Sequence, residues 1–167
     1  HLYYVNLNHA TTEAEMSYLA ELDDEDFGNV DALASSIDGN LIYAIDKTTK
    51  HMGEYNVSDG TLTDLGQIDP APNGIVLLAM STNDILYMAS ESTDRLYTVN
   101  TSTADVTDVG DTGINLSGSD IAFNSDGRLY CWTNNSETGA PAGLYELNTS
   151  TGAATIIGER EGGIGFS

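Results

Sequence analysis

Carboxylates are the most numerous ionisable side chains in this 167-residue chain, and they are densest between residues 22 and 31. Calcium binds several such oxygen ligands at once, so this segment contains four candidate metal ligands: Asp23, Asp24, Asp26 and Asp31. The spacing does not fit an EF-hand loop, which needs a glycine and a glutamate at fixed positions. Because runs of like charge are usually solvated, we interpret the segment as an exposed acidic loop. Calcium binding is the alternative, and no other cofactor is expected.

The histidines are the side chains best suited to acid–base catalysis near neutral pH. The chain has three of them: His1, His9 and His51. It contains no His-Glu-x-x-His motif and no Gly-x-Ser-x-Gly motif, so two common catalytic arrangements are missing. We therefore predict no catalytic residues and expect the histidines at strand edges. A hydrolase or lyase that uses histidines and acidic residues is the least favoured alternative.

Asn-x-Ser/Thr triplets occur five times, always in predicted loops or turns: Asn56, Asn100, Asn115, Asn134 and Asn148. In an exported protein such a triplet accepts a glycan. The same triplet also arises from turn chemistry, because an Asn that begins an Asx turn is often followed by Ser or Thr. Turn chemistry is the favoured interpretation of each site, and glycosylation is the alternative.

Cys131 and Trp132 lie together on one predicted strand. Cys131 is the only cysteine, so no intramolecular disulfide is possible, and we expect it to be a small buried side chain. Trp132 is expected in the core or in a groove. Because it lies close to Asn134, stacking of a sugar on its ring is an alternative.

Charge excludes one class of partner. Asp and Glu number 26 against 5 Lys and Arg, which gives a net charge of -21 that repels nucleic-acid phosphates.

The longest apolar run, Ile75–Met80, is far shorter than the roughly 20 residues of a membrane-spanning helix. Membrane insertion is not expected. The chain begins at His1 rather than at Met, so we expect that a leader was removed or that further residues precede it.

The elements that position these residues repeat along the chain. Three segments run from an Asn to a Gly ten residues later: 56–66, 100–110 and 148–158. In each, a strand ends at the Asn, a polar turn follows, and a strand that alternates Thr with apolar residues runs to the Gly. The pattern is typical of a β-hairpin.

A second hairpin precedes each of these, with a turn at Asp38–Asn40, Thr82–Asp84 or Ser125–Gly127. Each repeat therefore contains four strands, a to d, with the apolar strand a innermost and strand d at the edge. Four short strands in a period of roughly 40 to 50 residues are typical of β-propeller blades. We predict an all-β fold of antiparallel four-stranded blades, in which repeated tyrosines pack between blades: Tyr3, Tyr43, Tyr87, Tyr97, Tyr130 and Tyr145.

The repeat divides one predicted β-propeller domain, residues 1–167, into three complete blades at 30–70, 71–113 and 114–159. Residues 1–29 are predicted to supply strands c and d of an incomplete blade, and residues 160–167 its strand a. Both ends therefore lie in mid-blade, with about four blades in all or part of a larger propeller. Strand b of the incomplete blade is unaccounted for. Either further residues continue the propeller, or the ring closes imperfectly, or a neighbouring molecule supplies the strand by strand pairing.

The repeat resembles the propeller repeats of large bacterial secreted and surface proteins. It is most similar to a domain of unknown function in such proteins and more distantly to NHL-like and YVTN-type propellers. The resemblance rests on three segments: Gly28–Ala34, Leu144–Gly152 and Thr155–Gly158. It implies an exported scaffold or adhesive module and carries over no catalytic residue.

We therefore expect a non-enzymatic, extracellular or cell-surface scaffold that associates with itself or with a neighbouring domain, as a filament subunit or as a module of a larger protein. The predicted association edges contain six apolar residues: Leu2, Tyr3, Tyr4, Val5, Ile164 and Phe166. A glycan-binding or calcium-dependent adhesion module is the alternative.

Overall fold

The computed structural model describes residues 2–8, 13–20, 27–136 and 139–160, with side chains described from residue 27 onward, Ile75 and Val76 excepted. These residues form 14 strands and contain no helix long and apolar enough to cross a membrane. The strands are β1 Leu2–Asn8, β2 Glu13–Ala20, β3 Val30–Ser35, β4 Leu41–Asp46, β5 His51–Asn56, β6 Leu62–Gln67, β7 Ile75–Met80, β8 Leu86–Ser90, β9 Arg95–Val99, β10 Val106–Asp111, β11 Asp120–Phe123, β12 Leu129–Thr133, β13 Gly143–Leu147 and β14 Ala154–Glu159.

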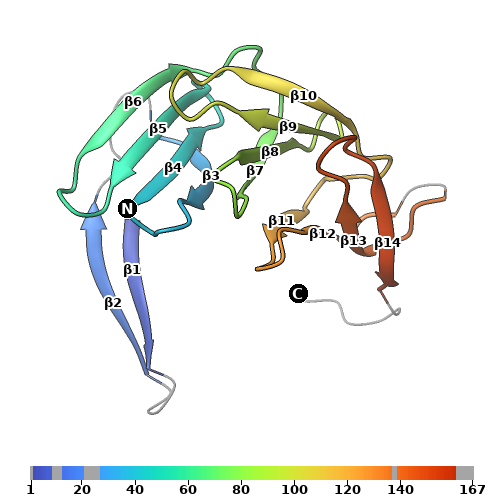
Figure 1. Ribbon diagram of the computed structural model, residues 1–167, viewed down its shortest axis with the longest axis horizontal. Helices are drawn as coiled ribbons and strands as arrows, with labels where there is room; N and C mark the ends of the chain where they lie inside the picture. The colour runs from blue at the N-terminus through green and yellow to red at the C-terminus, as the bar shows by residue number, and fades with distance from the viewer. Residues whose placement is uncertain (1, 9–12, 21–26, 137–138, 161–167) are drawn as a thin grey trace.

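Twelve of these strands form three antiparallel sheets of four: β3–β6, β7–β10 and β11–β14, here called the first, second and third blades. In each blade, strands that follow one another in sequence are neighbours in the sheet. Figure 1 shows the blades side by side along an arc, with β3, β7 and β11 on its inner side and β6, β10 and β14 on its outer side. The remaining strands, β1 and β2, pair antiparallel in a separate sheet. The prediction of an all-β fold of four-stranded antiparallel blades is confirmed.

The second strand of a blade packs against both neighbouring blades. In β8, Leu86 and Met88 belong to the core shared with the first blade, whereas Tyr87 and Ala89 belong to the core shared with the third. Because side chains alternate between the two faces of a strand, one strand contributes to two cores. The expected packing of tyrosines between blades is found at four positions: Tyr43, Tyr87, Tyr97 and Tyr145.

Hydrogen bonds also join the blades at their outer strands. The backbone N–H of Val106, at the start of β10, donates to the carbonyl oxygen of Asp69 at 2.8 Å. The N–H of Ala154, at the start of β14, donates to the carbonyl of Thr112 at 2.9 Å. The segments that follow β6 and β10 are therefore bonded to the outer strand of the next blade, so that these blades are connected at the rim as well as through their cores.

Candidate interaction site

The third blade exposes side chains at positions that are buried in the other two. The strand registers align three pairs of residues on β4, β8 and β12: Tyr43 with Ile45, Tyr87 with Ala89, and Tyr130 with Trp132. The first two pairs pack against the next blade and are at most 8% exposed. Trp132, by contrast, is 43% exposed. The third blade therefore presents a blade-packing surface without a blade packed on it among the described residues.

We call this surface the Tyr130–Trp132 face. It also includes Leu144 and Glu146 of β13, which pair directly with Trp132 and Tyr130 and so share their side of the sheet. An ion pair lies beside the apolar residues of this face. Arg128 Nε donates to Glu146 Oε1 at 2.8 Å, and the Arg128 guanidinium lies 5.7 Å from the centre of the Tyr130 ring. The hydrogen bond from Arg128 holds the pKa of Glu146 below its usual value, so this pair stays charged. An apolar centre with a charged rim is the usual anatomy of a protein interface.

Asn134 connects this face to the segment that follows β14. Trp132 Nε1 donates to Asn134 Oδ1 at 3.3 Å, and Arg160 Nη1 donates to the same oxygen at 3.4 Å. The indole N–H is thus engaged while the ring remains accessible.

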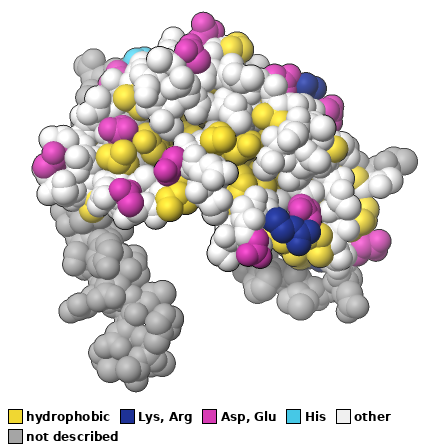
Figure 2. All heavy atoms as spheres, in the orientation of Figure 1, with side chains coloured by type: hydrophobic (Ala, Val, Ile, Leu, Met, Phe, Trp, Pro, Cys, Tyr) yellow, Lys and Arg dark blue, Asp and Glu magenta, His cyan; other side chains and the backbone are white. Residues whose placement is uncertain are grey.

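Figure 2 shows, on the side turned to the viewer, hydrophobic side chains gathered over the middle of the arc, with acidic side chains spread around them.

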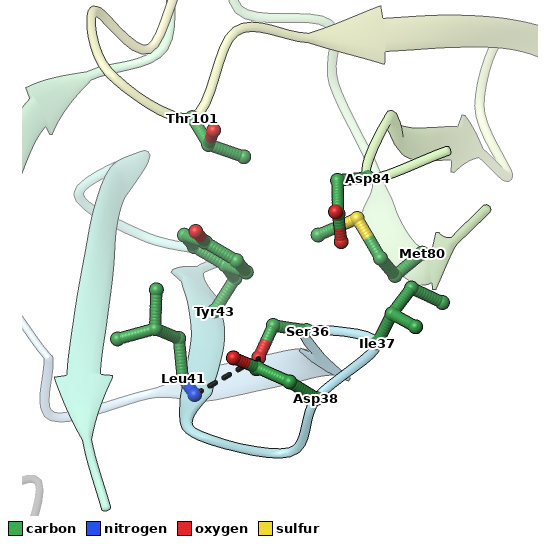
Figure 3. Close-up of a pocket in the computed structure, with 8 residues that line it drawn as sticks. All are labelled: Ser36, Ile37, Asp38, Leu41, Tyr43, Met80, Asp84 and Thr101. Carbon is green, nitrogen blue, oxygen red and sulfur yellow. Dashed lines mark hydrogen bonds between the residues drawn. The ribbon is translucent and has the colours of Figure 1, made fainter. Parts of the chain in front are cut away.

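A pocket of about 280 Å³ lies between the first and second blades. Figure 3 shows Tyr43 and Leu41 on one side of it and Met80 on the other, while Asp38 and Asp84 come from the turns that join the first two strands of the two blades. Carboxylates from two blades therefore border one cavity, whose lining also includes the apolar side chains of Ile37, Leu41 and Met80.

Two of these groups have pKa values that fix their charge. Burial raises the pKa of Tyr43, and the nearby charges of Glu54 and Asp84 raise it further, so its hydroxyl stays protonated at neutral pH. Hydrogen bonds from Ser36 and Asn40 hold the pKa of Asp38 below its usual value. Ser36 Oγ donates to Asp38 Oδ1 at 2.7 Å and also accepts from the N–H of Leu41 at 3.0 Å, the bond drawn in Figure 3. The turn that carries Asp38 is thus ordered, and its carboxylate is ionised.

Buried polar side chains end the second strand of every blade: Asp46, Ser90 and Thr133. Each bonds to the asparagine that precedes the first strand of its own blade. The N–H of Asn29 donates to Asp46 Oδ2 at 2.5 Å, Ser90 Oγ donates to the Asn73 carbonyl, and Thr133 Oγ1 donates to the Asn115 carbonyl at 2.8 Å. These bonds fix the entry into each blade without exposing the polar groups to water.

Four of the five predicted glycan acceptors begin turns. Ser58 N, Ser102 N and Ser150 N each donate at 2.9 Å to the side-chain oxygen of the asparagine two residues earlier: Asn56, Asn100 and Asn148 respectively. The N–H of Ser117 bonds to Asn115 in the same way. Turn chemistry therefore accounts for four of the triplets, and the bonds engage the amide oxygen and not the nitrogen that would carry a glycan. Glycosylation remains a prediction.

The candidate calcium ligands fall mostly outside the described residues. Asp23, Asp24 and Asp26 lie there, whereas Asp31 lies in β3 and its carboxylate is 3.6 Å from Lys47 Nζ. Across the described ranges, no three His, Cys, Asp or Glu side chains come together as a metal site. Calcium binding at residues 22–31 stays a prediction.

The three histidines are not assembled by the described part of the chain. His1 and His9 lie outside it, and His51 Nδ1 is 2.9 Å from Asp64 Oδ2, across the two outer strands of the first blade.

Cys131 is fully buried between the second and third blades, as the sequence predicts for a lone cysteine. Burial raises the pKa of its thiol to about 12.

The predicted association edges are described only in part. Leu2, Tyr3, Tyr4 and Val5 lie in β1, where Val5 pairs with Met16 of β2, while Ile164 and Phe166 lie outside the described residues. Their role in association stays a prediction.

Two features were not expected from the sequence. The inter-blade pocket is lined by residues from separate turns, and no pattern in the sequence links Asp38 to Asp84. The buried Asp46 had a detectable signal, because an aspartate that stands two residues before a pair of threonines, at the end of an apolar strand, is typical of an Asx turn.

Three contiguous four-stranded blades with shared cores define a β-propeller fold. The chain belongs to the family described as a repeat of unknown function, DUF6923, whose profile matches residues 4–164. A comparison with curated proteins finds no match.

Solved propeller structures are similar to this chain over most of its length. A nidogen–laminin complex matches with a TM-score of 0.66 and 15% identity, covering 92% of this chain and 56% of that one. A protein of unknown function from Bacteroides thetaiotaomicron matches with a TM-score of 0.60 and 13% identity, covering 83% and 37%. A catalytically inactive virginiamycin B lyase from Staphylococcus aureus, with quinupristin, matches with a TM-score of 0.56 and 13% identity, covering 92% and 47%. The chain spans less than two thirds of each of these structures, and such identities establish the fold alone.

Proposed function

We propose that this chain is a non-enzymatic scaffold module of an extracellular or cell-surface protein, and that it associates with a second copy of itself through its blade surfaces. The observation that carries the proposal is the Tyr130–Trp132 face. Equivalent residues in the first two blades pack against a further blade, whereas Trp132 is 43% exposed. The resemblance to repeats of secreted and surface proteins supports the extracellular placement.

The contact we propose has two parts. Apolar side chains of the second copy cover the Tyr130–Trp132 face. Within the chain, Tyr87 and Ala89 are buried in the same way, in a core that they share with the third blade. The strand edge at β1 adds backbone hydrogen bonds to the neighbouring sheet by strand addition. Head-to-tail repetition of this contact builds a filament when the rotation does not close a ring.

The full chain, studied by sedimentation velocity over a wide concentration range, tests this proposal. We expect its mean mass to grow with concentration and the variant Trp132→Asp to stay monomeric, because an aspartate at a buried interface is strongly unfavourable. Ile85→Asp is a matched control: Ile85 is also 43% exposed but lies in the second blade, directly before β8. A monomer at every concentration, or equal loss of association in both variants, would contradict the proposal.

A second candidate is glycan binding at the same face, favoured by the accessible ring of Trp132 beside Asn134. Indole rings bind sugars through their apolar faces. Retention of a sugar on a glycan array by the chain but not by Trp132→Ala, with and without a chelator, would support it. No retained sugar in either condition would exclude it.

A further inference from the structure

We propose that the pocket between the first and second blades binds the cationic side chain, lysine or arginine, of a basic segment in a partner protein. This inference goes beyond the proposed scaffold role, because it concerns a different surface and holds whether or not the chain associates with itself.

The charge of the pocket selects a cation. Asp38 and Asp84 border it from two blades, and the pKa of Asp38 is held low by hydrogen bonds from Ser36 and Asn40. Ser36, Thr101 and the protonated Tyr43 add hydroxyl groups whose oxygens can accept hydrogen bonds from an ammonium or guanidinium group. Among the described residues, no lysine or arginine lines the cavity. The site therefore offers negative charge and acceptors without a positive side chain of its own.

The shape of the pocket favours a side chain over a metal ion. Leu41, Met80 and Ile37 form apolar walls, on which the methylene groups of lysine or arginine can pack while the charged head reaches the carboxylates. The volume of about 280 Å³ is at the lower limit of pockets that hold small molecules. Both oxygens of Asp38 already accept hydrogen bonds, Oδ1 from Asn40 N at 3.0 Å and Oδ2 from Asn40 Nδ2 at 2.6 Å. Ser36 Oγ also donates to Oδ1, so one lone pair of Oδ2 is left. That lone pair can accept a hydrogen bond from a cationic side chain, whereas a hard cation such as calcium needs several oxygen ligands.

The charge of the whole molecule favours a foreign partner. A net charge of -21 attracts basic segments over a distance and repels a second copy of the chain. The chain's own Arg95 and Arg128 are paired with Asp108 and Glu146. A basic segment from a different protein is therefore the occupant we propose.

Nuclear magnetic resonance titrations of the full chain, at low ionic strength and at a concentration where it is monomeric, test the site. The probes are Nα-acetyl-lysine amide and Nα-acetyl-arginine amide, and their neutral counterparts are Nα-acetyl-norleucine amide and Nα-acetyl-citrulline amide. We expect the cationic probes to shift the signals of Ser36, Tyr43 and Thr101 in a saturable way and the neutral ones to leave them unchanged.

Variants then test whether the Asp84 carboxylate contributes to the binding of the cationic probes. Asp84 has a φ of 55°, a conformation that asparagine also adopts readily, so Asp84→Asn should preserve the turn. We expect it to weaken binding of the cationic probes about three- to fivefold. Asp126→Asn, in the corresponding turn of the third blade and outside the pocket, should change nothing.

Equal binding of neutral and cationic probes, or shifts that avoid the pocket, would overturn the inference. So would Asp84→Asn binding as well as the unaltered chain, or a free sugar shifting the same signals when the cations do not. None of these outcomes depends on the Tyr130–Trp132 face, so failure here and failure of the proposed self-association are distinguishable.

Discussion

Gly152 lies against Gly110 where the third blade meets the second. A Cβ atom added to Gly152 would be 2.5 Å from the carbonyl oxygen of Gly110, closer than side chains normally approach a backbone. Ala104 occupies the same turn position in the second blade with a φ of 58°, so alanine is compatible with the turn itself. The close approach to Gly110, and not the turn, is what requires glycine at position 152.

Substitution of Gly152 should therefore destabilise the chain more than substitution in an open turn. Gly152→Ala combines a left-handed conformation with a backbone clash, and we expect a loss of about 2 to 4 kcal/mol in the free energy of unfolding. Gly60→Ala has nearly the same φ, 75° against 80°, and meets only Tyr55 Oη at 3.6 Å, so it should lose about 1 kcal/mol. Urea unfolding measures both. Equal losses would mean that the contact with Gly110 does not constrain the interface.

Asp46 should stabilise the fold in a pH-dependent way. Its burial alone would raise its pKa, but N–H groups of Thr49, Asn29 and Thr48 outweigh that effect and hold the pKa below its usual value. The stabilisation is therefore present above about pH 4 and is lost as pH falls through the lowered pKa. We expect Asp46→Asn to cost about 1 to 3 kcal/mol at pH 7 and progressively less in acid.

Thermal unfolding from pH 7 to pH 2 measures this difference. The control is Asp59→Asn, at an exposed turn where Thr61 N donates to the carboxylate at 3.0 Å. It should have a much smaller effect at neutral pH, because water replaces the lost hydrogen bond. A difference in stability between Asp46→Asn and the unaltered chain that stays constant down to pH 2 would rule out the ionised carboxylate as the source of that difference.

Cys131 should be inert in the folded chain. Burial raises its pKa to about 12. At pH 8 only about one thiol in ten thousand is then ionised, and the thiolate is the reactive form. An aromatic disulfide reagent should label one thiol rapidly in urea and only slowly in buffer, at a rate limited by opening of the fold. Rapid labelling of the native chain would place Cys131 at an accessible surface.

Salt should act in opposite directions on the two proposed interactions. Each copy carries a net charge of -21, so association of copies is opposed by repulsion that salt screens. We expect self-association to strengthen between about 0.01 M and 0.5 M salt. Over the same range, binding of cationic probes to the pocket between the first and second blades should weaken. Sedimentation and titration over the same series measure both. Parallel salt dependences would show that one of the two contacts has been assigned the wrong chemistry.

Sequence alone was sufficient to predict the blades, because their signals are local. The turns at Asn56, Asn100 and Asn148 follow from side-chain bonds that span two residues. The exposure of Trp132 could not be predicted in this way, since a tryptophan on an apolar strand is equally consistent with a core position. Whether it is buried depends on what packs against β12, and that is a property of distant segments.

The pocket between the first and second blades also could not be predicted from the sequence. Asp38 and Asp84 are 46 positions apart in the chain, and they come together only because adjacent blades place corresponding turns at neighbouring sites. Periodicity predicts that such turns recur but not which of their side chains share a cavity. A comparison of residues at matched positions of successive repeats is the signal that would have directed attention to them.

The hydrogen bonds from Val106 to Asp69 and from Ala154 to Thr112 give the arc the energetics of a linear array. The second and third blades are each bonded to the preceding blade by the same type of contact, so stability is a sum of blade terms and nearest-neighbour terms. A defect in one blade then weakens its immediate neighbours most and fades with distance along the row. Gain or loss of a blade at one end of the row changes one interface and leaves the others intact, which lets such a repeat vary in length without redesign of its interior.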